Sequence, residues 1–330
     1  MNNSNQSRSL FWPIFLIGIG VIWLLGNLGF IAAANLGNIL RLWPLALVVI
    51  GLNLVIGRTS AVASAVIGLL AVGIIIAALV AAPALGMNNP TQPEIHTYTE
   101  TVNGADQADI YLDLSSYSTS IDTVRNKDNL FEGEIGAYGT VNYKVSGTNT
   151  RSISLSHTSS PDMWFNIPFN SVPLRWDIGL NPQVPTSLKV DAGSGSTQMD
   201  LGDLQLNDLR LDIGSGSMKL TLPTSIENYT ARIDGGSGSL DLRISGQENL
   251  TIELDMGSGS TDIDLPANVA IRIEVDDDGS GSLSLPKNTS KVSYGNDDDE
   301  GVWESEDYDS ADTRILVRIV GAGSGSINIR

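Results

Sequence analysis

Five aspartates recur at a fixed place in the second half of this 330-residue sequence, each two residues before a glycine-serine motif. Carboxylate oxygens are the ligands that calcium and magnesium prefer, and stacked carboxylates repel one another unless a cation neutralises them. The structural alternative is a turn, in which each carboxylate accepts hydrogen bonds from nearby backbone N–H groups. We favour the turn and keep a ladder that binds divalent cations as the second interpretation. The five residues are Asp191, Asp212, Asp234, Asp255 and Asp277.

The motif beside these aspartates is Gly-Ser-Gly-Ser, and it recurs in steps of 21 or 22 residues before a last step of 44. Recurrence at such a period indicates stacked repeats. Apolar and polar residues alternate around each motif, which is typical of half-buried strands. Glycine reaches the positive φ of a sharp corner, so each repeat is predicted to be strand, corner, strand and turn rather than flexible linker. The predicted corners begin at Gly193, Gly214, Gly236, Gly257, Gly279 and Gly323.

Residues 175–330 are therefore predicted to form an all-β, single-stranded β-solenoid-like domain with aliphatic ladders inside. The inward residue three positions before the corner is expected to be Val190, Leu211, Ile233, Leu254 or Val320, and Val275 where an extra aspartate shifts the pattern. The acidic stretch at about 294–312 is predicted to be an insertion, either a solvated loop or a site for a cation or a basic partner. Residues 101–174 are predicted to be an N-terminal β segment that caps the stack, because solenoids need covered ends.

The first 93 residues have a different composition, since they contain no Asp, Glu or Lys. A helix needs roughly 20 apolar residues to cross a bilayer. Three spans are predicted within residues 1–86, at about 10–33, 39–56 and 61–85, followed by a linker at 87–100. Three spans and the distribution of arginines predict a multi-pass membrane protein with its β domain outside the cytoplasm.

The composition also excludes several functions. The sequence has no cysteine, which rules out disulfides, thiolate catalysis and iron–sulfur clusters. Its net charge of −18 argues against nucleic-acid binding, which needs a basic surface. His96 and His157 are the only histidines, and no catalytic motif accompanies them. No enzyme activity and no cofactor are predicted.

Two parts of the chain resemble known families. Phe11-Trp12-Pro13 and Leu42-Trp43-Pro44 open two similar apolar segments, which resemble the LiaI/LiaF-type transmembrane region of bacterial envelope-stress proteins. The glycine-serine repeats resemble toastrack or adhesin-like domains. The resemblance implies a non-enzymatic, membrane-anchored sensor or regulator of cell-envelope stress that acts through protein contacts. Its implied partners are the lipid bilayer and a membrane protein such as a sensor kinase. The alternative is a surface-displayed adhesin-like or scaffolding module. The chain departs from better-known members by having three predicted spans instead of four.

Overall fold

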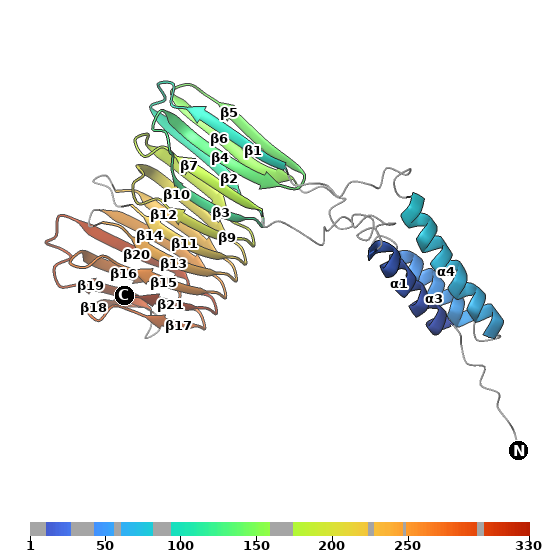
Figure 1. The fold of residues 1–330 in the computed structure, drawn as a ribbon. Coiled ribbons are helices and arrows are strands. Elements are labelled where there is room, and N and C mark those ends of the chain that lie inside the picture. Colours follow the sequence, from blue (N-terminus) through green and yellow to red (C-terminus); the bar gives the residue numbers. More distant parts are fainter. Residues whose placement is uncertain are drawn as a thin grey trace, which may run out of the picture. The chain divides into compact units, whose positions relative to one another are not determined.

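The computed structural model describes residues 11–27, 43–55, 61–81, 94–158, 174–223, 228–246, 249–295 and 300–330. These residues form two compact units, one that contains the helices and one that contains the strands. Figure 1 shows the helices and the layered strands, and each unit is described by itself below.

The helical unit contains α1 (Phe11–Asn27), α3 (Trp43–Val55) and α4 (Ala61–Ala81). Helices α1 and α4 lie so close that a Cβ atom on Gly18 would collide with Val72. Val49 and Ala71 are buried where α3 meets α4. None of the helices in the described ranges has the length and apolar character required to cross a membrane. The predicted spans at 10–33, 39–56 and 61–85 are thus not confirmed as spans, and their remaining residues lie outside the described ranges.

The β unit consists of two sheets, one of ten strands and one of eleven (Figure 1). Across the middle of the stack each repeat gives one strand to each sheet, and neighbouring repeats pair in parallel. The strands are β1 (Glu94–Thr101), β2 (Gln107–Asp113), β3 (Ser118–Thr123), β4 (Asn129–Ala137), β5 (Thr140–Ser146), β6 (Thr150–Thr158), β7 (Arg175–Leu180), β8 (Thr186–Asp191), β9 (Ser196–Asp200), β10 (Leu206–Ile213), β11 (Ser217–Leu222), β12 (Thr230–Gly235), β13 (Ser239–Ile244), β14 (Leu250–Met256), β15 (Ser260–Asp264), β16 (Ala270–Val275), β17 (Ser282–Ser284), β18 (Thr289–Tyr294), β19 (Gly301–Ser305), β20 (Arg314–Gly321) and β21 (Ser326–Ile329).

Aliphatic side chains fill the space between the two sheets. Leu211, Ile233 and Leu254 lie in register on neighbouring strands and are buried. Leu220, Leu242 and Ile263 do the same in the other sheet. Parallel, in-register stacking places equivalent residues of successive repeats about 4.8 Å apart. The shared aliphatic core therefore follows directly from the repeat.

The order of the layers departs from the order of the chain at both ends. Strands β20 and β21, which end the chain, lie between β14/β15 and β16/β17. Figure 1 shows β20 between β14 and β16. At the other end, β2 and β3 lie between β6/β7 and β8/β9. Residues 101–174 are therefore not only a cap, because β2 and β3 form a complete layer of the stack.

Antiparallel strands extend the eleven-stranded sheet at both ends and the ten-stranded sheet at its N-terminal end. Strands β18 and β19 continue from β16, while β4, β1 and β5 extend the sheets beyond β7 and β6. Tyr98 on β1 and Tyr143 on β5 meet across the two sheets with ring centroids 4.5 Å apart. Burial raises the pKa of Tyr143 to about 12. These aromatic rings close the N-terminal end of the core.

The predictions for two segments and for one core residue differ from the structure. The predicted linker 87–100 contains β1, which begins at Glu94. The predicted insertion at 294–312 contains β19, a capping strand, because the acidic segment connects two layers of the stack. Val320 is exposed, and Ile319 takes the inward place because the pairing of β14 with β20 shifts by one residue there.

The corners are held together by close contact between backbones. A Cβ atom on Gly216 would collide with the carbonyl oxygen of Gly195 in the layer below, and Gly238 has the same relation to Gly216. Positive φ angles of 51°, 67° and 57° occur at Gly193, Gly279 and Gly323. The other three first glycines, Gly214, Gly236 and Gly257, have no positive φ, so the predicted reason for glycine is wrong there. Close stacking, more than a turn angle, requires glycine at these corners.

We expect Gly238→Ala to lower the free energy of unfolding of the β unit by about 1–3 kcal/mol, the usual cost of forcing atoms into a packed site. Urea unfolding followed by circular dichroism measures the change. Gly202→Ala is the control, because a Cβ atom on Gly202 would approach mainly the side chains of Ser245 and Asp200. Equal stability of Gly238→Ala and the unchanged chain would contradict the stacking explanation.

Candidate functional site

The aspartates of the repeats form a row on the outer face of the eleven-stranded sheet. Asp191, Asp212, Asp234 and Asp255 occupy matching places on β8, β10, β12 and β14. Asp113 on β2 pairs with Asp191 and extends the row by one layer. The sequence search missed Asp113 because its corner, Ser115-Ser116, lacks the glycine-serine motif. Five carboxylates thus follow one another across five strands, and they are called the acidic row below.

Asp277 does not continue this row. Gly321 lies opposite Asp255 and breaks the succession of carboxylates. The Oδ1 atom of Asp277 accepts a hydrogen bond from the Gly279 N–H at 2.8 Å, and Oδ1 of Asp113 accepts one from the Ser115 N–H at 3.2 Å. The turn interpretation therefore describes the geometry of these two residues. Within the described ranges, the other four aspartates accept no such bond, and cation binding by the row stays a prediction.

A separate acidic group lies beside Asp277. Single carboxylate oxygens of Asp277, Asp278 and Glu300 lie within 4.8 Å of one another. Asp277 and Asp278 lie in the corner after β16, and Glu300 directly precedes β19, which pairs with β16. Exposed carboxylates often gather in this way without a ligand. The three carboxylates lie together because the acidic stretch that contains Glu300 folds back against the corner that follows β16.

The acidic row is electrostatically unfavourable at its centre. The pKa of Asp234 is raised, first by partial burial and then by the neighbouring charges of Asp255 and Asp212. A raised pKa means that the ionised form is disfavoured in the folded protein. In-register stacking thus forces like charges together at a cost to stability.

Basic residues form a second row on the same strands. Lys189, Arg210 and Arg232 lie in register on neighbouring strands, two residues before the aspartates. Asp208 accepts ion pairs from Arg210 at 3.0 Å and from Arg232 at 2.8 Å. Arg232 also pairs with Glu253 at 3.0 Å. The outer face therefore alternates rows of opposite charge.

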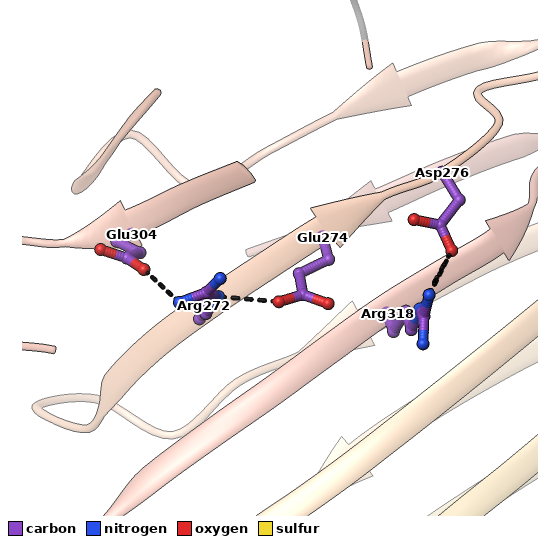
Figure 2. Close-up of polar contacts among 5 residues, drawn as sticks. All are labelled: Arg272, Glu274, Asp276, Glu304 and Arg318. Atoms are coloured by element: carbon purple, nitrogen blue, oxygen red, sulfur yellow. Dashed lines mark hydrogen bonds and ion pairs between the residues drawn. The ribbon is translucent and has the colours of Figure 1, made fainter. Parts of the chain in front are cut away.

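Ion pairs also fix the C-terminal layers, as Figure 2 shows. Arg272 on β16 pairs with Glu274 on its own strand and with Glu304 on β19, each at 2.8 Å. Arg318 on β20 pairs with Asp276, which follows β16, at 2.9 Å. The pairs Arg272–Glu304 and Arg318–Asp276 cross between chain segments far apart in the sequence. They stabilise the order in which the last repeat lies inside the stack.

The glycine-serine corners form an uncharged strip. Exposed serines follow one another in register from β9 to β17, and a shallow groove of about 970 Å³ runs along them. The Ser217 hydroxyl donates to the Ser196 hydroxyl at 3.3 Å. The side chains repeat without variation along the strip. The arrangement fits close stacking of corners, and the residues that line the groove are glycines and serines, with no acid or base among them.

The two histidines lie apart from the acidic row. His96 lies on β1 and approaches Glu94 at 3.5 Å. His157 is buried at the end of β6, where its Nε2 lies 2.5 Å from the Tyr138 carbonyl oxygen. Its ring packs edge-on against Tyr117 and Trp176. The His157 Nε2 atom also lies 3.4 Å from the Tyr117 hydroxyl oxygen, so this ring is held by packing and hydrogen bonds within the β unit.

We expect Asp234→Asn to stabilise the β unit at pH 7 by about 0.2–1 kcal/mol, the size of a cross-strand pair. A carboxyl group with a raised pKa contributes most stability below its unfolded pKa and loses it as pH rises through the folded pKa. The gain from the substitution should therefore shrink as pH falls below the pKa of Asp234. Thermal unfolding between pH 3 and pH 7 measures it. Asp203→Asn, in an exposed turn, is the control; a gain independent of pH would contradict this origin.

Several solved structures share a general likeness with this chain. A candidate cell adhesion protein from Clostridium sporogenes is 20% identical, with a TM-score of 0.46, over 72% of this chain and 99% of its own. A candidate adhesin from Bacteroides fragilis is 14% identical, with a TM-score of 0.35, over 73% and 99%. A candidate lipid-binding protein from Parabacteroides distasonis is 14% identical, with a TM-score of 0.30, over 72% and 96%. No functional conclusion follows from likenesses this low.

Family comparisons cover both units. No curated protein matches the chain. Residues 10–55 match the family of LiaI-LiaF-like transmembrane regions, which includes α1 and α3. Residues 89–243 match the N-terminal domain of toast_rack, which runs from β1 into β13. One chain thus carries a segment similar to LiaI-LiaF-like transmembrane regions and a segment similar to the N-terminal domain of toast_rack.

Proposed function

We propose that this protein is a non-enzymatic, membrane-anchored regulator of the bacterial response to cell-envelope stress. The observation that carries the proposal is the presence, in one chain, of a LiaI-LiaF-like transmembrane region at 10–55 and a toast_rack domain at 89–243. The first anchors the protein to the cell membrane and contacts a membrane partner, such as a sensor kinase. The second is a rigid stack that presents charged rows to ligands or proteins.

The physical properties of the β unit support a binding role. Its core is continuous from β2 to β21, so the outer faces keep a fixed geometry. Charged side chains on those faces repeat at strand spacing, which suits recognition of an extended partner. A regulator of this kind acts by forming and breaking contacts with other molecules and not by catalysing a reaction. The adhesin-like or scaffolding alternative rests on the same repeated surface and differs in its consequence for the cell.

We expect deletion of residues 94–330 to change transcription of envelope-stress genes when cells are treated with cell-wall antibiotics. The reason is that the helical region would remain in the membrane without the unit that senses. A transcriptional reporter measures the response. Gly238→Ala provides a milder version, with Gly202→Ala as its control. A normal response together with altered binding of cells to surfaces would favour the adhesin-like alternative instead.

The β unit is proposed to lie outside the cytoplasm. Externally added protease should then digest it in intact cells whose outer layers have been opened, with the membrane left whole. Digestion is followed with a tag at the C-terminus. A cytoplasmic protein serves as the control for leakage. Protection until lysis would reverse the proposed orientation, and it would leave the regulatory proposal to act from the cytoplasmic side.

A further inference from the structure

A second feature of the outer face lies at the N-terminal end of the eleven-stranded sheet. Lys144, Ser154, Tyr111, Lys189 and Arg210 occupy matching places on five consecutive strands. A groove of about 480 Å³ runs along them. We propose that this basic row binds an acidic polysaccharide, a sugar polymer that carries carboxylate or phosphate groups, laid along the axis of the stack.

The ligand is expected to be negatively charged, because two lysines in the groove have no carboxylate partner in the part of the chain that the structure describes. Arg210, Arg232, Arg272 and Arg318 all form ion pairs with carboxylates. Within the described ranges, no carboxylate lies within ion-pair distance of Lys144 or Lys189. Two carboxylates, Asp109 and Asp208, also border the groove, and Asp208 is engaged by two arginines. In a chain with net charge −18, positive charge is thus available at this end of the sheet.

The sugar follows from the groups between the cations. The Tyr111 ring lies in the groove, and the Lys189 Nζ is 5.6 Å from its centroid. A flat aromatic ring packs against the C–H face of a sugar ring, and its hydroxyl end stays polar. Ser152, Ser154 and Ser187 border the groove with hydroxyls that both donate and accept hydrogen bonds. A cation, an aromatic face and hydroxyls side by side fit a charged sugar better than a bare anion.

The shape of the ligand follows from the spacing of the row. Neighbouring strands are about 4.8 Å apart, so Lys144 and Lys189 are separated by about 14 Å, and Arg210 lies one strand further. A single phosphate cannot span these positions, whereas a polymer of several units can. The side chains along a strand that share a face are about 7 Å apart. Asp109, at one border of the groove, and Asp113 and Asp191, beyond the other border, therefore confine the ligand to a narrow path.

The narrow path also favours a polymer over a membrane surface as the ligand of the basic row. An anionic bilayer would meet the acidic row at the same time as the basic row, and the two contributions would oppose each other. A chain one sugar wide contacts the lysines and avoids most of the carboxylates. More distant acidic groups are screened, since the Debye length is about 8 Å at physiological ionic strength. The inference does not depend on the proposed regulatory role, because binding is measured on the purified protein.

The test uses the full chain in a neutral detergent and polygalacturonate as the probe, with binding measured by titration calorimetry. We expect binding that weakens as sodium chloride rises. Lys144→Gln combined with Lys189→Gln should weaken it at least tenfold. Tyr111→Leu should weaken binding of polygalacturonate and leave binding of polyglutamate, which has no sugar ring, unchanged. Lys219→Gln is the matched control, because Lys219 is an exposed lysine on the other sheet.

Several outcomes would overturn the proposal. Equal binding by the double lysine variant would show that the basic row is not the site. Equal binding of fully methyl-esterified polygalacturonate would show that charge plays no part. Tighter binding to polyglutamate would assign the row to an acidic peptide, and binding only to phosphatidylglycerol vesicles would assign it to the membrane. Circular dichroism of each variant separates lost binding from lost folding.

Discussion

Close stacking of backbone on backbone at the corners is the constraint on which the β unit depends. The second glycine of each motif leaves no room for a side chain, because the carbonyl oxygen of the layer below lies in its place. This contact fixes the distance and the register between repeats. Every later feature of the unit, including the aliphatic core and the rows of charge, inherits that register. A repeat that lost it would displace the strands on both sides of the corner.

In-register stacking also explains why like residues meet. When repeats have the same sequence pattern, each side chain lies above its own counterpart, so serines form one row and aspartates another. For serine this is harmless, since neighbouring hydroxyls bond to each other. For aspartate the neighbouring charges of Asp255 and Asp212 add to the effect of partial burial, and both raise the pKa of Asp234 at the centre of the row. Arg232, two residues before Asp234 on the same strand, pairs with Asp208 and Glu253, which lie outside the acidic row.

Much of the repeat could be predicted from the sequence, because apolar and polar residues alternate at the same places in every 21- or 22-residue period. This alternation shows which side chains face the core. Leu211, Ile233 and Leu254 are inward as the alternation predicted. The order of the layers could not be predicted, since the period of the sequence is the same whether the last repeat lies at the end of the stack or between two other layers. One signal was present: Val275 and Ile319 each lie four residues before their corner and not three. The two strands that share this extra residue are neighbours in the structure.

The same swap at both ends has a physical reason. A stack built in chain order would end on its last parallel layer, with an open core and unpaired strand edges that invite association. Here the chain first goes past the end, forms the antiparallel strands β18 and β19, and then returns to place β20 and β21 inside the stack. Strands β20 and β21, the last of the chain, are thereby paired on both sides. The exposed edges of the two sheets are the short β17 and β18. On β18, the Lys291 Nζ lies 4.8 Å from the centroid of the Trp303 ring. Because β2 and β3 are inserted in the same way, the rows of side chains on the parallel strands between the two ends stay in register, as recognition of a regular ligand requires.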